Sequence, residues 1–294
     1  MATLGTQFAD HAAVRERALR SLNDLPPFSP VLNRLLAMLG KEDVSVNDMA
    51  SVIERDTVLA GNVLRLVNSG LYGRRATITS VACAISLLGL TRLRNVALGM
   101  SVSRIWQKLR FARGFSLVRF NHHSLAVALL ADGIATRVPV EFSEGAFVAG
   151  LFHDLGRLLM ATSLSEEYEA IERIIAGAED RSAQARDHIE REILGITHAE
   201  LSASALTKWN LPPPVIAAVT SHHHPGRARD GKVPLALAVQ VADEMADQLS
   251  AGVSEYEDRG GDPDLALLTS VGVQNPDTFI GQFRTEYDSM RAVA

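Results

Sequence analysis

Apolar side chains recur every three to four residues along most of this 294-residue chain, and this spacing limits what the chain can fold into. The segment VLNRLLAML (31–39), for example, gathers all of its apolar residues on one broad face, as an amphipathic helix does. The strict alternation of apolar and polar residues that indicates a half-buried β-strand is absent. We therefore predict an all-α protein, whose helices mostly end at glycines or prolines.

The predicted helices form an N-terminal and a C-terminal group. The first group covers 31–39, 45–56, 57–70, 80–89 and 91–106. The second group covers 118–137, 144–162, 165–178, 184–194, 198–209, 213–222 and 234–249, with one more amphipathic helix within 276–293. Ser45, Ser80 and Thr91 are the predicted N-caps, because a hydroxyl there can accept from the free N–H groups of the first turn.

The composition indicates a soluble protein of the cytoplasm. Hydrophobic residues make up 47% of the chain, which is enough for a large core, and no apolar run approaches the roughly 18 residues of a spanning helix. The first residues lack the apolar stretch of a secretory signal. A formal net charge of −5 argues against a surface that coats nucleic acid. The single cysteine, Cys83, is expected to pack as a small hydrophobe in a reducing compartment.

An ionisable pair, His153-Asp154, interrupts the otherwise apolar segment GLFHDLGRL (150–158). Burying either group unpaired costs several kcal/mol, so the two must bind something or hold each other. Imidazole and carboxylate are ligands for Fe, Mn, Ni or Zn, and one ion would satisfy both. Adjacent helical residues point ~100° apart, so such an ion would lie beside the helix axis. Its other ligands would come from neighbouring helices, for which His123 and Asp243 are suitable.

Several motifs in a fixed order make the chain similar to a known family. They are HHS (122–124), HDLG (153–156), GITHAEL (195–201), WNLPPPVIAAVTSHHHP (209–225) and VADEMAD (241–247). Together they resemble the HDOD domain, the HD-related output domain of bacterial signalling proteins. Segments of the N-terminal half, such as DTVLAGNVLRLVNSGLYG, resemble the first lobe of that family. The resemblance covers about residues 20–250.

The resemblance implies a two-lobed helical bundle with an HD-like second lobe. The first lobe would cover about 20–115 and the HD-like lobe about 116–250, between an N-terminal extension (1–19) and a C-terminal extension (251–294). One or two divalent ions would be held by ligands at seven positions: His123, His153, Asp154, His198, His222, His223 and Asp243. Arg157 stands where HD-GYP relatives carry a lysine, and would steady phosphate charge.

The resemblance leaves more than one function open. The main expectation is a stand-alone regulatory protein that acts on a protein partner, with a metal or nucleotide in the HD-like pocket; a homodimer is compatible with this. The alternative is a metal-dependent phosphohydrolase, in which a bound ion lowers the pKa of a coordinated water. No DGxGYP stretch follows His223, which argues against a cyclic-di-GMP phosphodiesterase.

A second alternative is a DNA-binding regulator that acts through the first lobe. The segment 46–69 superficially resembles a helix-turn-helix, and arginines that could contact phosphates lie in or near it. They are Arg65, Arg74, Arg75, Arg92 and Arg94. The second helix of this segment is largely apolar and is expected to be buried, so nucleic acid is not the expected partner. A second basic stretch, within 104–119, is interleaved with aromatic residues that more often seat a helix on its neighbour.

Overall fold

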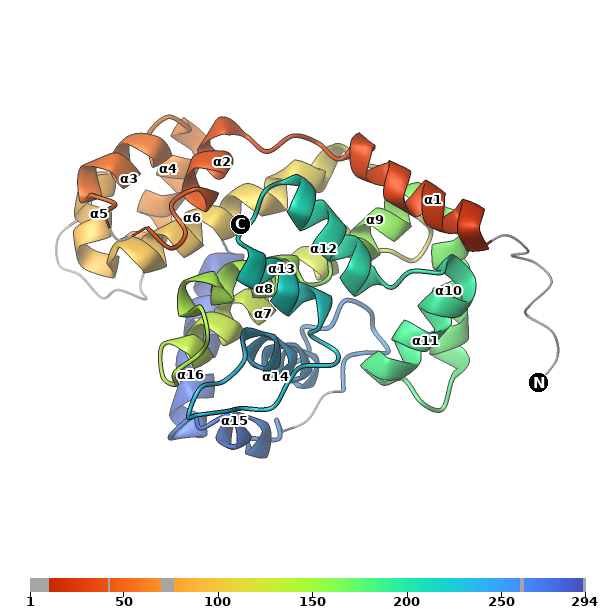
Figure 1. The fold of residues 1–294 in the computed structure, drawn as a ribbon. Helices are drawn as coiled ribbons and strands as arrows, with labels where there is room; N and C mark the ends of the chain where they lie inside the picture. Colours follow the sequence, from red (N-terminus) through yellow and green to blue (C-terminus); the bar gives the residue numbers. More distant parts are fainter. Residues whose placement is uncertain (1–10, 42, 70–76, 260–261, 293–294) are drawn as a thin grey trace.

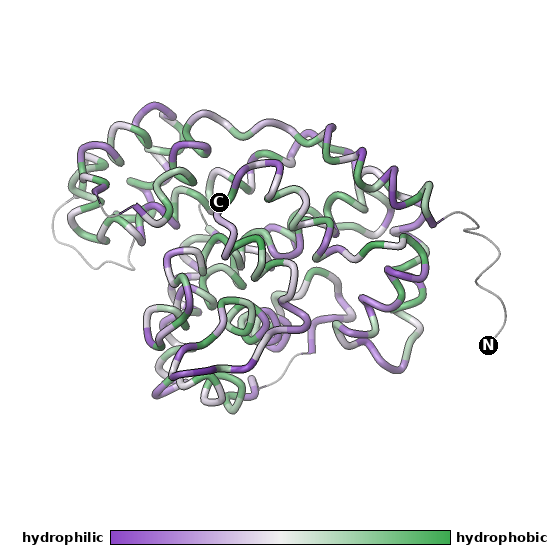
Figure 2. The backbone as a smooth tube through the Cα atoms, in the orientation of Figure 1, coloured by the Kyte–Doolittle hydropathy of each residue, from purple (hydrophilic) through white to green (hydrophobic). Residues whose placement is uncertain are grey.

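The computed structural model describes residues 11–41, 43–69, 77–259 and 262–292 (Figure 1). Every regular element in these ranges is a helix, and extended pairing among them is limited to isolated bridges such as Val140 with Val233. The all-α prediction is therefore confirmed. Figure 2 shows hydrophobic and hydrophilic residues alternating along most helices, as amphipathic helices require.

The first lobe contains five helices of the described chain. They are α2 (Pro30–Leu36), α3 (Val46–Ile53), α4 (Thr57–Val67), α5 (Val81–Leu88) and α6 (Leu90–Ile105). The predicted caps Ser45 and Ser80 are confirmed, since each side chain accepts from a backbone N–H of the first turn. The predicted cap at Thr91 is wrong, because α6 already begins after Gly89, which has a φ of 83°. Cys83, expected to be packed, is exposed on α5.

The second lobe surrounds a long central helix, α7. Its helices are α7 (Leu117–Ala135), α8 (Ala146–Phe152), α9 (Leu155–Ser163), α10 (Ser165–Gly177), α11 (Ala183–Leu194), α12 (His198–Lys208), α13 (Pro213–Thr220) and α14 (Leu235–Gln248). Helices α8 and α14 make the most extensive contacts with α7, and α12 lies against α9 and α13. Both ends of the described chain join this lobe: α1 (His11–Ser21) packs on α9 and α11, and α16 (Pro276–Arg291) packs on α7 (Figure 1).

The predicted single helix 144–162 is wrong, because the chain breaks at His153-Asp154 into α8 and α9. The break depends on α12, whose Ser202 hydroxyl donates to the carbonyl of His153 (2.9 Å) and accepts from the N–H of Gly156 (2.7 Å). These two backbone groups would otherwise be unpaired in the core. Gly156 also allows the close approach, since a Cβ there would lie 2.1 Å from the carbonyl oxygen of His198.

Aromatic side chains join the two lobes around the start of this break. Trp209, at the end of α12, lies 4.0 Å from Phe28 and 5.9 Å from Phe152 between ring centroids. Trp106 follows α6 and lies 6.4 Å from Trp209. Phe152 immediately precedes His153, so this cluster fixes the entry to the turn that carries the ionisable pair.

No single helix in the described part of the chain is long and apolar enough to cross a membrane. Among the described residues, the pair Val81–Leu88 and Leu90–Lys108 has the required length and composition when taken together, but the chain bends by 119° between the two helices.

The packing at Gly156 predicts a severe effect of adding one methyl group. Gly156→Ala should destabilise the protein by about 3 kcal/mol or more, because the new Cβ meets backbone atoms of α12 that cannot move aside. Gly61→Ala, inside α4 with open space around its Cα, should instead stabilise it by about 0.5–1 kcal/mol. Urea denaturation measures both. Equal stability of the two variants would contradict the close approach of α9 to α12.

Candidate metal centre

The seven residues predicted as metal ligands converge on one small volume in the second lobe. His123 lies on α7, His153 and Asp154 in the turn before α9, and Asp243 on α14. His198 begins α12, and His222 and His223 follow α13. Six of the seven are buried, and Asp243 is partly exposed. Convergence of these groups is a necessary condition for a shared metal site, and their ligating role stays a prediction.

His123, His153 and Asp243 form the tightest part of this cluster. The Nε2 atoms of the two histidines are 3.2 Å apart, and Oδ1 of Asp243 lies 3.2 Å and 3.5 Å from them. Donor atoms bound at about 2.1 Å to one ion lie about 3.0–3.4 Å apart at tetrahedral or octahedral angles. The spacing of these three atoms is therefore that of ligands on a single ion.

In three of the histidines, a hydrogen bond from Nδ1 on the outer side of the ring determines that Nε2 faces the cluster. Nδ1 donates to a backbone carbonyl in His123 (Ala251 O, 2.9 Å), His153 (Gly150 O, 2.8 Å) and His222 (Val219 O, 2.7 Å). A carbonyl oxygen can only accept, so each Nδ1 carries a proton and each ring turns its Nε2 inward. Metal-binding histidines are held in the same way.

Carboxylates anchor the two remaining histidines. Nδ1 of His198 lies 2.7 Å from Oε2 of Glu190, and Nδ1 of His223 lies 3.1 Å from Oδ1 of Asp187. His198, His222 and His223 form a second group whose donor atoms lie within 4.8 Å of one another. Nε2 of His222 is buried without a hydrogen-bond partner, and Nε2 of His198 has the Asp154 carboxylate beside it at 3.2 Å. An unpaired buried lone pair is costly, and a cation would satisfy that of His222.

Asp154 connects the two groups through a single oxygen. Its Oδ1 lies 3.6 Å from Nε2 of His153, 3.2 Å from that of His198 and 4.0 Å from that of His222. Oδ2 accepts from Nη1 of Arg157 at 3.0 Å and lies 3.8 Å from Nε2 of His123. A carboxylate between two sets of donors is the arrangement that two-metal sites use. The buried His/Asp groups are therefore compatible with one metal ion or two.

Without a metal, protons balance the charges of the cluster. Burial alone would lower the pKa of His123, but the hydrogen bond to Asp243 and the charges of Asp243 and Asp154 raise it to about 9. Burial is likewise outweighed at His198, where Glu190 and Asp154 raise the pKa to about 10. Burial would raise the pKa of Asp154, yet the charges of His153 and Arg157 hold it well below its usual range.

The predicted phosphate contact, Arg157, is a buried member of an ion-pair network. Its Nη1 donates to Asp154 and its Nη2 to Oε1 of Glu257 (2.9 Å). Arg186 donates to the same Oε1 of Glu257 (2.9 Å) and to Glu172 (2.8 Å). Both ends of the Arg157 guanidinium are thus engaged within the protein. Its contact with phosphate stays a prediction.

Sequence analysis missed the residues that surround the ligands, although α11 carries a signal for three of them. Arg186, Asp187 and Glu190 fall in register with Ile193 and Leu194, at the i, i+1, i+4, i+7 and i+8 positions of one buried face. Charged residues in core positions of an amphipathic helix indicate a buried polar site. No local pattern identifies the other missed residues, Ser202 and Glu257.

The arginines considered for DNA binding are largely engaged or outside the described residues. Arg94 is buried, and Arg92 pairs with Glu286 at 2.9 Å. Arg74 and Arg75 lie outside the described residues. In the second basic stretch, Trp106 is fully buried and seats its segment in the core.

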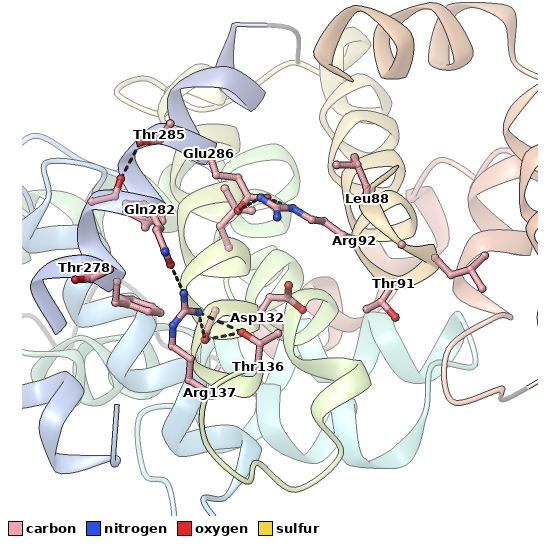
Figure 3. Close-up of a pocket in the computed structure, with 17 residues that line it drawn as sticks. Leu88, Thr91, Arg92, Asp132, Thr136, Arg137, Thr278, Gln282, Thr285 and Glu286 are labelled. Atoms are coloured by element: carbon pink, nitrogen blue, oxygen red, sulfur yellow. Dashed lines mark hydrogen bonds and ion pairs between the residues drawn. The ribbon is translucent and has the colours of Figure 1, made fainter. Parts of the chain in front are cut away.

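A separate cavity of about 930 Å³ lies where the α5–α6 junction, α7 and α16 meet (Figure 3). Arg92 reaches across it to Glu286, and Arg137 binds Gln282, so two polar bridges tie α6 and α7 to α16. Asp132 lies in its wall and accepts from Asn95 at 2.9 Å. None of the seven predicted ligands lines this cavity. It is a second concave site, distinct from the metal centre.

Asp132 predicts a pH dependence that does not involve the metal centre. Burial and the Glu286 carboxylate raise its pKa from 3.8 to about 6, so the folded state holds this proton more tightly than the unfolded state. Its contribution to stability should fall as the pH rises from about 4 to about 6. Asp132→Asn should flatten this fall and stabilise the protein at pH 7 by on the order of 1–2 kcal/mol. Denaturation at pH 4.5 and 7, with exposed Asp43→Asn as control, tests this, and unchanged curves would contradict it.

The protons on His123 and His198 predict how metal uptake depends on pH. Both rings are protonated at neutral pH in the metal-free protein, so an entering ion must displace protons. The apparent affinity for Zn²⁺ or Mn²⁺ should rise about tenfold per pH unit for each displaced proton. Calorimetry in two buffers of different ionisation enthalpy counts the protons. Binding without net proton release would refute the proposed charge balance.

Comparison with known proteins identifies the family and the fold. The HDOD domain family matches residues 25–225. An HDOD domain protein with unknown function from Geobacter sulfurreducens has a TM-score of 0.72 at 21% identity, covering 94% of this chain and 97% of that one. A candidate phosphohydrolase from Shewanella amazonensis SB2B has a TM-score of 0.69 at 22% identity, with coverages of 94% and 97%. At these identities the likeness shows the fold.

Two further relatives are longer than this chain. A candidate signal transduction protein from Marinobacter aquaeolei VT8 has a TM-score of 0.68 at 21% identity, covering 97% of this chain and 66% of that one. A curated relative, an uncharacterized protein of Treponema pallidum (strain Nichols), is 25% identical over 238 residues, which are 80% of this chain and 44% of that protein. The chain thus spans less than half the length of this relative.

Proposed function

Because the chain belongs to the HDOD family, we propose that it is a regulatory protein of signal transduction whose second, HD-like lobe holds a divalent metal. Its ligands would be the seven residues of the cluster, and its output would pass to a protein partner. Fe, Mn, Ni and Zn all suit such a set of imidazoles and carboxylates. The nucleotide ligand and the homodimer stay predictions.

One observation carries the metal assignment: Nε2 of His222, on a fully buried ring, has no hydrogen-bond partner. The hydrogen bond from Nδ1 to the carbonyl of Val219 fixes this ring, so Nε2 cannot turn away to find a partner. A polar core without a ligand is tolerable only when each member is satisfied. A cation between the rings meets that condition.

The burial of the cluster favours holding a metal over turning over a substrate. The five histidines and Asp154 are at most 5% exposed, and the side chain of Asp243 is 19% exposed. Neither the 930 Å³ cavity nor the smaller one beside His122 is lined by any of these residues. A phosphoester could reach them only after the surrounding segments moved. A bound ion would instead cross-link α7, α12, α14 and two turns, and so stabilise this lobe by mass action. A partner that contacts the lobe could respond to this difference in stability between the metal-bound and the metal-free lobe.

Metal-dependent phosphohydrolysis is the second candidate, and the position of Asp154 favours it. Its Oδ1 lies between the two groups of histidines, as a bridging ligand would. A bound metal supplies a water of lowered pKa at neutral pH. In that case Arg157 would orient the bridging carboxylate, since its Nη1 donates to Oδ2 of Asp154.

Metal content and turnover, measured together, separate the two candidates. The purified protein should contain about one or two equivalents of a transition metal, and Asp154→Ala should lose most of it, because this carboxylate contacts both groups. His188→Ala, an exposed histidine outside the cluster, is the matched control and should keep its metal. Elemental analysis measures the metal content of each protein.

Hydrolysis of bis(p-nitrophenyl) phosphate by the same preparations tests the enzyme alternative. The regulatory proposal expects no turnover above the Asp154→Ala background. Metal-dependent turnover that Asp154→Ala abolishes and His188→Ala preserves would favour the hydrolase. A wild-type protein that takes up no metal after incubation with Mn²⁺, Fe²⁺, Ni²⁺ or Zn²⁺ would refute the metal assignment.

A further inference from the structure

A short segment after α14 closes over the metal centre from outside the part of the chain that matches the family. We call this segment, Ala251–Asp258, the strap. We propose that the strap completes the metal centre, and that its Glu257 is a positioning residue that orients the carboxylate of Asp154 through Arg157. This inference rests on the proposed metal function.

The strap has a defined conformation against the second lobe. Arg119 of α7 holds its backbone, donating to the carbonyls of Val253 (3.3 Å) and Ser254 (2.9 Å), and also pairs with Asp258. Asp258 in turn accepts from the N–H of Gly252 at 2.7 Å. The strap is therefore anchored at both of its ends by groups that lie on α7 or within itself.

Two contacts reach from the strap into the cluster. The carbonyl of Ala251 accepts from Nδ1 of His123 (2.9 Å) and so fixes which nitrogen of that ring faces the cluster. Oε1 of Glu257 accepts from Nη2 of Arg157 (2.9 Å), while Oε2 accepts from the N–H of Ser254 (2.9 Å). Both oxygens of Glu257 are thus used, one inside the strap and one toward the site.

Arg157 transmits this contact because its two arms have different partners. Nη2 binds Glu257, and Nη1 binds Oδ2 of Asp154 at 3.0 Å. The second contact occupies Oδ2 and leaves Oδ1 toward the rings of the cluster. Glu172 could not replace Glu257 as the partner of Arg157, because it already pairs with the neighbouring Arg186. Loss of the charge on Glu257 should therefore leave Nη2 without its anchor, so that the guanidinium no longer holds Asp154 in a fixed orientation.

A matched pair of charge-neutral variants tests the relay. Glu257→Gln removes the carboxylate that holds Arg157. Glu172→Gln removes a carboxylate from the same network, but one that contacts Arg186 and the Tyr256 hydroxyl and not Arg157. Titration of the metal-free proteins with Co²⁺ gives both affinity and a visible spectrum that depends on coordination. Glu257→Gln should bind Co²⁺ about 10–100-fold more weakly and with an altered spectrum. Losses of this size are typical when a residue that orients a metal ligand is removed. Glu172→Gln should resemble wild type within about threefold, because it leaves the contacts of Arg157 with Glu257 and Asp154 in place.

Each outcome decides the proposal. Wild-type affinity and spectrum in Glu257→Gln would overturn it, and so would equal weakening in both variants, which would indicate an effect of overall charge. If wild type itself binds no Co²⁺, the proposed metal function fails separately. A crystal structure of metal-free Glu257→Gln then tests the role of Glu257 by itself. An Asp154 carboxylate that keeps its contact with Arg157 would overturn the proposed role, and a rotated Asp154 carboxylate would support it.

Discussion

The hydroxyl of Ser202 is the contact on which the rest of the site depends. It pairs the two backbone groups that the break between α8 and α9 leaves free, and Gly156 lets the broken end approach α12 closely. Without the break, His153 and Asp154 would point ~100° apart around one helix. With it, both reach the same cluster, and His198, at the first residue of α12, meets them there.

Around this turn, charges are arranged in layers. Inward-facing Nε2 atoms and carboxylates form the centre, and the Nδ1 atom of each histidine is held by a carbonyl or a carboxylate. Arg157 and Arg186 lie behind the acids and are themselves held by Glu257 and Glu172. Such a network is stable only when complete, since removing one partner of a buried pair leaves the other charged and unsolvated. These pairings fix the geometry in a way that a purely apolar core would not.

Much of this could be predicted from local patterns. The periodicity of apolar residues indicated the helices, and the Ser45 cap followed from its spacing to Asp48, because helix formation depends on neighbours within a turn or two. The residue types of the cluster also followed from motifs. The helix over 144–162 was wrong because its periodicity continues through the break. Glu190 and Asp187 were missed because charged residues on a helix usually face solvent.

The sequence by itself determined that the chain forms helices, which residues could ligate a metal, and to which family its motifs belong. Only the tertiary structure decided where α8 ends, which nitrogen of each ring faces inward, and that Glu257 supports Asp154. The physical reason is the distance along the sequence between the residues that meet. Helical patterns involve residues three or four apart, whereas Ser202 meets Gly156 across 46 positions and Glu257 meets Arg157 across 100. No local pattern encodes such contacts, because they exist only once the lobe has packed.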